Sequence, residues 1–166
     1  MDNCFSLAKA TEPGMNGQLL LPFRLFLDAG VFVAAAGSPT GGSALVLELC
    51  ERGYCQACTS CLILREAERN IRRKFPEDAL LRFYQILADL DMEIIDPPSR
   101  GEVMACQELI DPQDAHVLAS AAKSNVSFLL TLDRRRFMTE RIRQKDLGFG
   151  IMPPGDFLQA FLDVLE

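Results

Sequence analysis

Four acidic residues in this sequence could together hold a cation: Asp28, Glu66, Asp114 and Asp133. Asp28 follows the apolar run 25–27, and Asp133 follows the largely apolar run 127–132. Both runs are short enough for buried strands. Ligands of open α/β sheets bind beyond the carboxyl ends of the strands, so these two acids mark one candidate site. Each acid could instead be a helix N-cap, for which Asp is a favoured residue.

Asp114 lies at the start of a predicted helix. Asp111 is predicted as the N-cap of this helix and Pro112 as its first residue. At 3.6 residues per turn, Asp114 shares a stripe with Val117 and Leu118. A buried carboxylate must be protonated, hydrogen-bonded back to the helix start, or bound to a cation. Because Asp111 already accounts for the cap, we favour a cation ligand over a capping-box acid at this position.

The helix predicted over 60–74 supplies the fourth acid. It begins at Ser60 and carries an apolar stripe that includes Ala67. Glu66 and Glu68 flank the stripe on different sides, and Glu68 lies nearer its centre, so helical spacing alone does not choose between them. The alternative is that both are solvated partners of nearby arginines.

Carboxylates of this kind favour Mg²⁺ or Mn²⁺. Both ions prefer hard oxygen ligands, and Mg²⁺ is usually held by a few carboxylates with several waters. One or two such ions can position a phosphodiester, activate a water and stabilise the leaving oxygen. Protonation of the acids is therefore expected to release the metal and abolish activity.

The segments that would position these acids alternate between strand-like and helix-like patterns. Strands are predicted near 24–28, 54–58, 92–95 and 127–132. Helices are predicted near 31–36, 41–52, 60–74, 76–90, 100–109, 112–124 and 134–144. This alternation predicts an α/β fold with a parallel sheet covered by helices on both faces.

Length and composition predict one globular domain. The chain has 166 residues, of which 49% are hydrophobic and 24% charged. Residues 1–21 carry turn signals without sustained periodicity, so we expect an N-terminal arm there and the domain over 22–166. The apolar run 19–21 is broken by Pro22 and is too short for a signal peptide or a membrane span. A cytoplasmic protein is expected.

The order and spacing of the acids resemble the PIN domain superfamily. The resemblance lies in residues 25–28, in Ser60 with Glu66 six residues later, in 111–114 before an Ala-rich helix, and in 130–133. It extends to the tail at 150–158 and covers the chain from about residue 23 to 158. It implies a three-layer fold of about five strands, with a last short strand near 149–152. The spacing from Ser60 favours Glu66 over Glu68.

The resemblance also implies an activity, that of a metal-dependent ribonuclease similar to the toxin half of bacterial toxin–antitoxin pairs. The implied ligands of Mg²⁺ or Mn²⁺ are Asp28, Asp114 and Asp133, with Glu66 as a ligand or water-orienting base. Thr131 matches a hydroxyl residue that supports the site in the family. The implied partners are RNA and an antitoxin protein, and such toxins commonly form homodimers.

One residue departs from the family pattern. Family members commonly carry Asn two residues after the first acid, and Gly30 stands there. Glycine supplies no side-chain hydrogen bond to hold the acids. This difference keeps an alternative open: a PIN-fold module with weakened catalysis that binds RNA or a protein partner. A haloacid-dehalogenase-like phosphatase is disfavoured, because it would require Asp at the position of Gly30.

Two other kinds of site are disfavoured. Cys55, Cys58 and Cys61 have the spacing of a thiol metal site, but the fourth cysteine of a ferredoxin run is missing. On a strand, Cys55 and Cys58 would point to opposite faces, so we interpret these thiols as small buried hydrophobic residues. His116 falls on the opposite side of its helix from Asp114, so we expect a solvated or rim residue and no general base.

Charge is unevenly distributed along the chain. The net charge of −6 disfavours a tight, nonspecific nucleic-acid binder. Basic residues nevertheless cluster in two places: Arg65, Arg69, Arg72, Arg73 and Lys74, and then Arg134, Arg135, Arg136, Arg141, Arg143 and Lys145. Beside an acidic metal site they could hold RNA phosphates. The alternative is that they form solvated helix faces paired with nearby acids.

Overall fold

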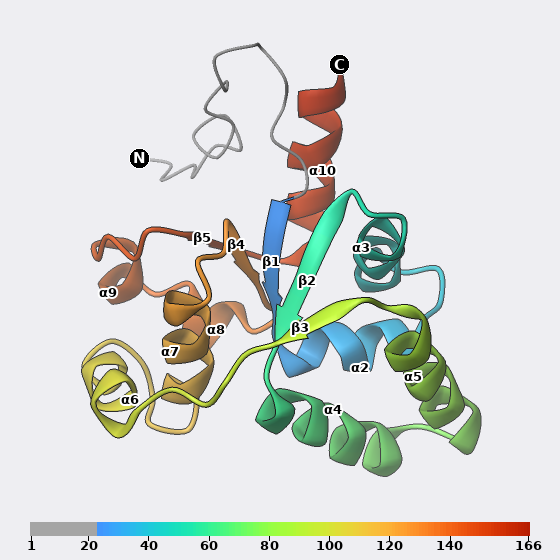
Figure 1. The fold of residues 1–166 in the computed structure, drawn as a ribbon, viewed down its shortest axis with the longest axis horizontal. Coiled ribbons are helices and arrows are strands. Elements are labelled where there is room, and N and C mark those ends of the chain that lie inside the picture. Colours follow the sequence, from blue (N-terminus) through green and yellow to red (C-terminus); the bar gives the residue numbers. More distant parts are fainter. Residues whose placement is uncertain (1–22) are drawn as a thin grey trace.

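Five parallel strands form one sheet (Figure 1). The computed structural model describes residues 23–166, so the predicted arm at 1–21 lies outside the described residues. In sheet order the strands are β3 (Met92–Ile94), β2 (Cys55–Thr59), β1 (Phe23–Leu27), β4 (Phe128–Leu130) and β5 (Gly150–Met152). The chain order reverses at β1, which pairs with both β2 and β4. The carboxyl ends of β1 and β4 therefore lie side by side at the reversal point, where such sheets bind ligands.

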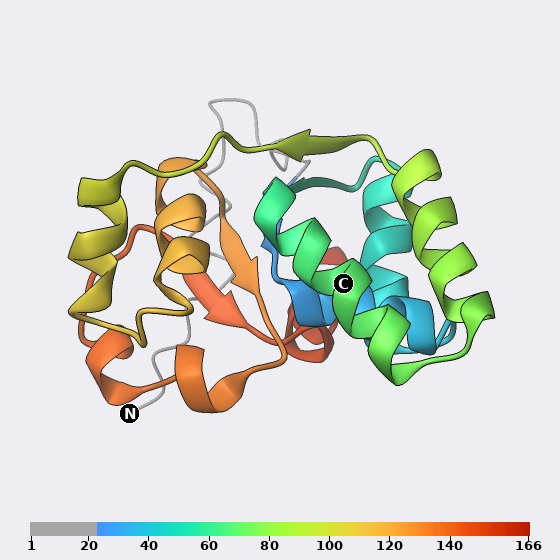
Figure 2. The same cartoon turned by 90° about the horizontal axis from the view of Figure 1, so that it is seen from below.

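Helices cover the sheet on both sides. Within the described residues they are α2 (Ala29–Gly37), α3 (Gly42–Glu51), α4 (Cys61–Lys74), α5 (Glu77–Asp89), α6 (Arg100–Gln107), α7 (Ala115–Lys123), α8 (Arg134–Phe137), α9 (Glu140–Arg143) and α10 (Pro154–Leu165). Figures 1 and 2 show α6–α9 gathered on one side of the strands and α2–α5 on the other. The structure thus confirms the predicted three-layer α/β fold.

Apolar packing fixes the central strands. Every residue of β4 is buried, and in β1 only Arg24 is partly exposed. Four phenylalanines of β1, β4 and α10 form an aromatic cluster with neighbouring ring centroids 5.9–6.3 Å apart: Phe23, Phe128, Phe157 and Phe161. Such tilted and edge-to-face contacts stabilise a core beyond its buried area. The cluster holds β1 and β4 in register, so the positions of their carboxyl ends are fixed.

The strand predictions near 24–28, 54–58, 92–95 and 149–152 agree with the structure to within one residue at each end. The strand predicted over 127–132 is too long. Only Phe128–Leu130 pair with β1 in the sheet and form β4. Beyond Leu130 the chain turns into the pocket described below. No single helix among residues 23–166 is both long and apolar enough to cross a membrane; α2 and α3 meet that test only as a pair bent by 103°.

The predicted helix over 134–144 is wrong. The chain forms two short helices there, α8 and α9, because Met138 leaves helical geometry at φ −111° and ψ 42°. The side chain of Thr139 then accepts a hydrogen bond from the backbone N–H of Ile142 at 3.3 Å and caps α9. The Thr139 cap therefore begins a new helix, and α8 does not continue into α9.

The predicted helix start at Pro112 is also wrong, by about one turn. The helix begins at Ala115 with Asp114 in the N-cap position. Asp111 caps the preceding turn instead, since its Oδ1 accepts from the backbone N–H of Gln113 at 2.9 Å. Asp114 makes no side-chain cap bond to its own helix, so its carboxylate is available to other partners.

Candidate functional site

The four predicted acids line one pocket of about 500 Å³ at the carboxyl ends of β1 and β4. They come from four separate segments of the chain: the ends of β1 and β4, the middle of α4 and the start of α7. The pocket is also lined by Gly30, Asn70, Leu132 and the basic residues Arg134, Arg135 and Arg136. The fold therefore gathers carboxylates that are up to 105 residues apart in the sequence, from Asp28 to Asp133.

Asp28 is held rigidly as it enters the pocket. Its Oδ1 accepts from the backbone N–H of Ala29 at 2.8 Å, which makes it the N-cap of α2. Its Oδ2 accepts from the Thr131 hydroxyl at 2.7 Å. Burial raises the pKa of Asp28, the two hydrogen bonds partly oppose the rise, and the charges of Glu66 and Asp114 add to it. The cap and pocket interpretations of Asp28 are therefore compatible.

Thr131 connects two of the acids. Its side chain is fully buried. While its hydroxyl donates to Asp28, its Oγ1 also accepts from the backbone N–H of Asp133 at 3.2 Å. Asp133 in turn caps α8 by accepting from the backbone N–H of Arg136 at 3.1 Å. The hydroxyl thus fixes the spacing between the ends of β1 and β4.

Asp114 is the most buried member of the ion pairs at this site. Its side chain is 17% exposed, and its Oδ2 accepts from Arg136 Nη1 at 3.0 Å. Arg136 Nε also lies 3.6 Å from Asp133 Oδ2. Burial raises the pKa of Asp114, and Arg136 lowers it in part. One guanidinium therefore bridges two of the four acids.

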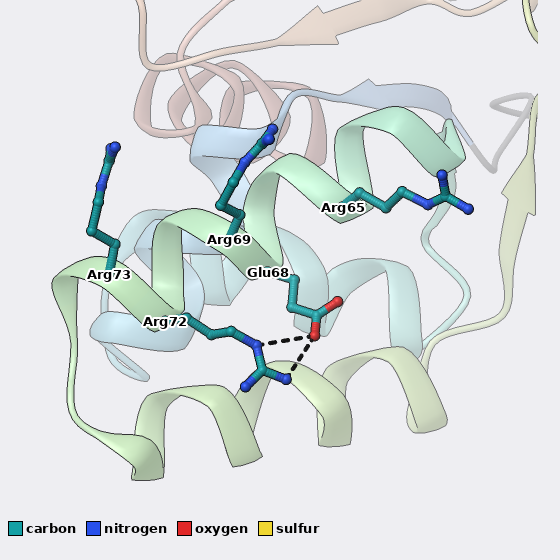
Figure 3. A pocket seen from close by; sticks show the side chains of 5 residues that line it. All are labelled: Arg65, Glu68, Arg69, Arg72 and Arg73. Atoms are coloured by element: carbon teal, nitrogen blue, oxygen red, sulfur yellow. Dashed lines mark hydrogen bonds and ion pairs between the residues drawn. The ribbon is translucent and has the colours of Figure 1, made fainter.

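The structure separates Glu66 from Glu68. Glu66 lines the pocket. Glu68 instead points toward Arg72, as Figure 3 shows, and is hydrogen-bonded to Tyr84 of α5. The Tyr84 hydroxyl donates to Glu68 Oε1 at 2.6 Å, and Arg72 Nη2 donates to the same oxygen at 2.9 Å. Together they hold the pKa of Glu68 below its usual range. Only Glu66 is thus in a position to act with Asp28.

Sequence reasoning missed Asn70. It lies one helical turn after Glu66 and lines the same pocket, where it brings a side-chain amide. In the PIN domain superfamily that the sequence resembles, the usual amide position is that of Gly30, which also lines the pocket but contributes no side chain. The available signal was the spacing of four residues from Glu66, which places both side chains on one face of α4.

The carboxylates fit a divalent cation in ligand type, since hard oxygen donors suit Mg²⁺ and Mn²⁺. Their side chains, however, are not grouped around a single metal position. Among residues 23–166, no three His, Cys, Asp or Glu side chains are grouped so that they could hold a metal ion as they stand. Two of the acids pair with Arg136 instead. Metal binding at Asp114 and Asp133 would therefore compete with these ion pairs.

The residues of the disfavoured sites lie elsewhere. Cys55 and Cys58 are buried in β2, as predicted, but the prediction of a buried thiol is wrong for Cys61, which is exposed at the start of α4. His116 is partly buried, its Nδ1 atom is buried without a hydrogen-bond partner among the described residues, and it does not line the pocket.

A family model described as PIN domain matches residues 24–135. Two solved structures, VapBC2 from Rickettsia felis bound to a DNA fragment from its promoter and PAE2754 from Pyrobaculum aerophilum, share the fold with TM-scores of 0.54. They are 15% and 16% identical to this chain. The alignments cover 78% and 86% of this chain and 98% and 99% of the respective structures. VapC20 from Mycobacterium tuberculosis, described as a sarcin-ricin loop cleaving toxin, is 14% identical with a TM-score of 0.48, covering 67% of this chain and 91% of that one. The search of curated proteins finds no match.

The raised pKa of Asp28 predicts a stability change. The folded, metal-free protein binds a proton at Asp28 more readily than the unfolded chain does, so proton binding there contributes to the free energy of unfolding. This contribution to stability is fully present below the ordinary pKa of Asp and is lost as pH rises through the raised pKa of Asp28. Asp28→Asn removes the charge and keeps an oxygen to cap α2. We expect it to raise the melting temperature near pH 7, by about 2–4 °C per kcal/mol, and to lose this advantage as pH falls.

Thermal melts of metal-free protein between pH 4 and 8 measure this effect. Asp91→Asn, at an exposed acid before β3, is the matched control and should leave the melting temperature nearly unchanged. A lower melting temperature for Asp28→Asn at pH 7 would show that the charge of Asp28 is not a cost to the fold.

Proposed function

Because the chain belongs to the PIN domain family, we propose that it is a metal-dependent ribonuclease that hydrolyses phosphodiester bonds of RNA. The observation that supports this proposal most strongly is the pocket where four carboxylates from four segments meet. Burial raises the pKa of both Asp28 and Asp114, as is common at functional sites. Helix capping accounts for Asp28 and Asp133, but it gives no reason for Glu66 and Asp114 to share their cavity, since carboxylates repel one another.

We assign Asp28, Asp114 and Asp133 as ligands of Mg²⁺ or Mn²⁺. When bound, the ion would supply Lewis acidity at the phosphodiester and stabilise charge on the leaving oxygen. Glu66 would serve as a further ligand or accept a hydrogen bond from the attacking water and orient it. Thr131 would keep Asp28 in place through its 2.7 Å hydrogen bond.

A row of arginines beside the pocket supports RNA as the substrate. Arg65, Arg69 and Arg73 follow one another at four-residue spacing on α4, the helix that also carries Glu66 and Asn70. Figure 3 shows Arg69 and Arg73 extending on the side of α4 away from Glu68 and Arg72. Like charges at this spacing destabilise a helix slightly. Phosphates of a single strand that enters the pocket would offset that repulsion.

We further propose that the protein is the toxin of a toxin–antitoxin pair. This part rests on the family, since similarity to the Rickettsia felis and Pyrobaculum aerophilum structures shows the fold alone. Expression of the chain should then arrest growth, and co-expression of a small protein encoded beside it should relieve the arrest. Growth unaffected by the chain would count against the proposal.

Homodimer formation stays a prediction, measured by light scattering.

The second candidate function is a PIN-fold module that has lost most of its catalysis and binds RNA or a protein partner. Two observations favour it. Gly30 supplies no side chain at the family's amide position, and the acids are not grouped for a metal. Such a module would bind its partner undiminished after Asp133→Asn, whereas the enzyme would lose its activity.

Matched pairs of acids test the enzyme proposal. We expect Glu66→Gln and Asp114→Asn to reduce metal-dependent cleavage of single-stranded RNA by about 100-fold or more. Glu68→Gln and Asp111→Asn remove neighbouring acids that do not line the pocket, so most activity should remain. The assay compares Mg²⁺, Mn²⁺ and EDTA. Wild-type protein that cuts no RNA with either ion would favour the binding module.

The arginine row predicts a salt-dependent contribution to RNA affinity. Arg69→Gln combined with Arg73→Gln should weaken RNA binding and reduce the slope of log affinity against log salt by about 0.7 for each phosphate that the variant no longer neutralises. Fluorescence anisotropy in EDTA measures this without cleavage. Arg52→Gln is the control, because Arg52 precedes the amino end of β2, whereas the pocket lies at the carboxyl ends of the parallel strands. An unchanged slope in the double variant would remove α4 from the RNA path.

A further inference from the structure

Arg136 reaches two of the acids that the proposed function assigns to the metal. Its Nη1 lies 3.0 Å from Asp114 Oδ2, and its Nε lies 3.6 Å from Asp133 Oδ2. Its backbone N–H also donates to Asp133 Oδ1 at 3.1 Å. The contact to Asp114 spans 22 residues of sequence, so it is a product of the tertiary fold.

We propose that Arg136 is a built-in counter-cation of the metal-free site, which a divalent cation must displace from Asp114 and Asp133 in order to bind. The inference rests on the proposed metal site, and it adds a competitor supplied by the chain itself. It also accounts for the acids being ungrouped, since the guanidinium pairs with two carboxylate oxygens that a metal would need.

The electrostatics require a positive partner at this place. Asp114 is 17% exposed, and the charges of Asp133 and Asp111 act on it unfavourably. An unpaired carboxylate in such a position is costly, so Arg136 stabilises the charged form when no metal is present. Arg136 keeps its own charge at every accessible pH, so protonation of the arginine plays no part in the competition.

Arg136 can leave the acids without disturbing the core. Half of its side chain is exposed, and α8 is a four-residue helix held through the backbone N–H of Arg136 rather than through its guanidinium. Rotation of the side chain would free both acids while the N-cap bond to Asp133 remains. The competition therefore involves rotamers of one side chain and not a change of fold.

The neighbouring arginines provide a matched control. Arg134 and Arg135 line the same pocket and carry the same charge. Arg134 lies 3.6 Å from Asp156, outside the four acids, whereas no ion pair involves Arg135 among the described residues. Removing Arg135 changes the net charge of the pocket as much as removing Arg136, without releasing Asp114 or Asp133.

Calorimetric titration of the full-length, metal-free protein with MnCl₂ tests the inference. Loss of one positive charge should strengthen Mn²⁺ binding in both Arg135→Gln and Arg136→Gln. Arg136→Gln should bind Mn²⁺ about three- to tenfold more tightly than Arg135→Gln, because it also removes the two ion pairs. Arg136→Lys, which keeps the charge but lacks the planar fork, should fall between wild type and Arg136→Gln.

Each other outcome overturns the inference in a different way. Equal Mn²⁺ affinity of Arg135→Gln and Arg136→Gln would show a general charge effect and leave the metal site intact. Weaker binding by Arg136→Gln would show that the arginine supports the site. No binding by any of the proteins would remove the metal site, and with it the proposed function. Circular dichroism verifies folding, and Arg136→Lys carries the comparison if Arg136→Gln does not fold.

Discussion

Repulsion among carboxylates that share one pocket is the constraint around which this structure is arranged. Three of the four acids have a specific neighbour that offsets part of the repulsion. Asp28 accepts from a backbone N–H and from Thr131, Asp133 accepts from the backbone N–H of Arg136, and Asp114 pairs with the Arg136 guanidinium. Burial still leaves the pKa of Asp28 and Asp114 raised, so the neighbours compensate only in part. An added cation would complete the compensation.

The backbone of the fold supplies much of this compensation. Asp28 and Asp133 each end a strand and cap the helix that follows, so the same carboxylate terminates one element and begins another. The backbone N–H of Asp28 donates to the Leu130 carbonyl at 3.1 Å, which brings the ends of β1 and β4 together. The proposed function and the junction between the ends of β1 and β4 therefore depend on the same residues.

Opposite charges lie next to each other on this face of the molecule. The chain carries a net charge of −6, yet α4 presents Glu66 and Asn70 to the pocket and a row of arginines beside them. This arrangement suits a polyanion that must approach an acidic site, because the arginines compensate for repulsion by the carboxylates. The same arrangement suits a module that only binds, so chemistry at the acids, and not charge, separates the two candidate functions.

The sequence by itself determined the alternation of strands and helices and the acids at strand ends, because apolar periodicity and capping are local properties. Other features were decided only by tertiary contacts. Packing of α4 directs Glu66 into the pocket and Glu68 toward Tyr84, a choice that helical spacing left open and that only the family resemblance favoured. The pairing of Arg136 with Asp114 was invisible to the sequence. It depends on the distance between two separate segments of the chain, which local patterns do not encode.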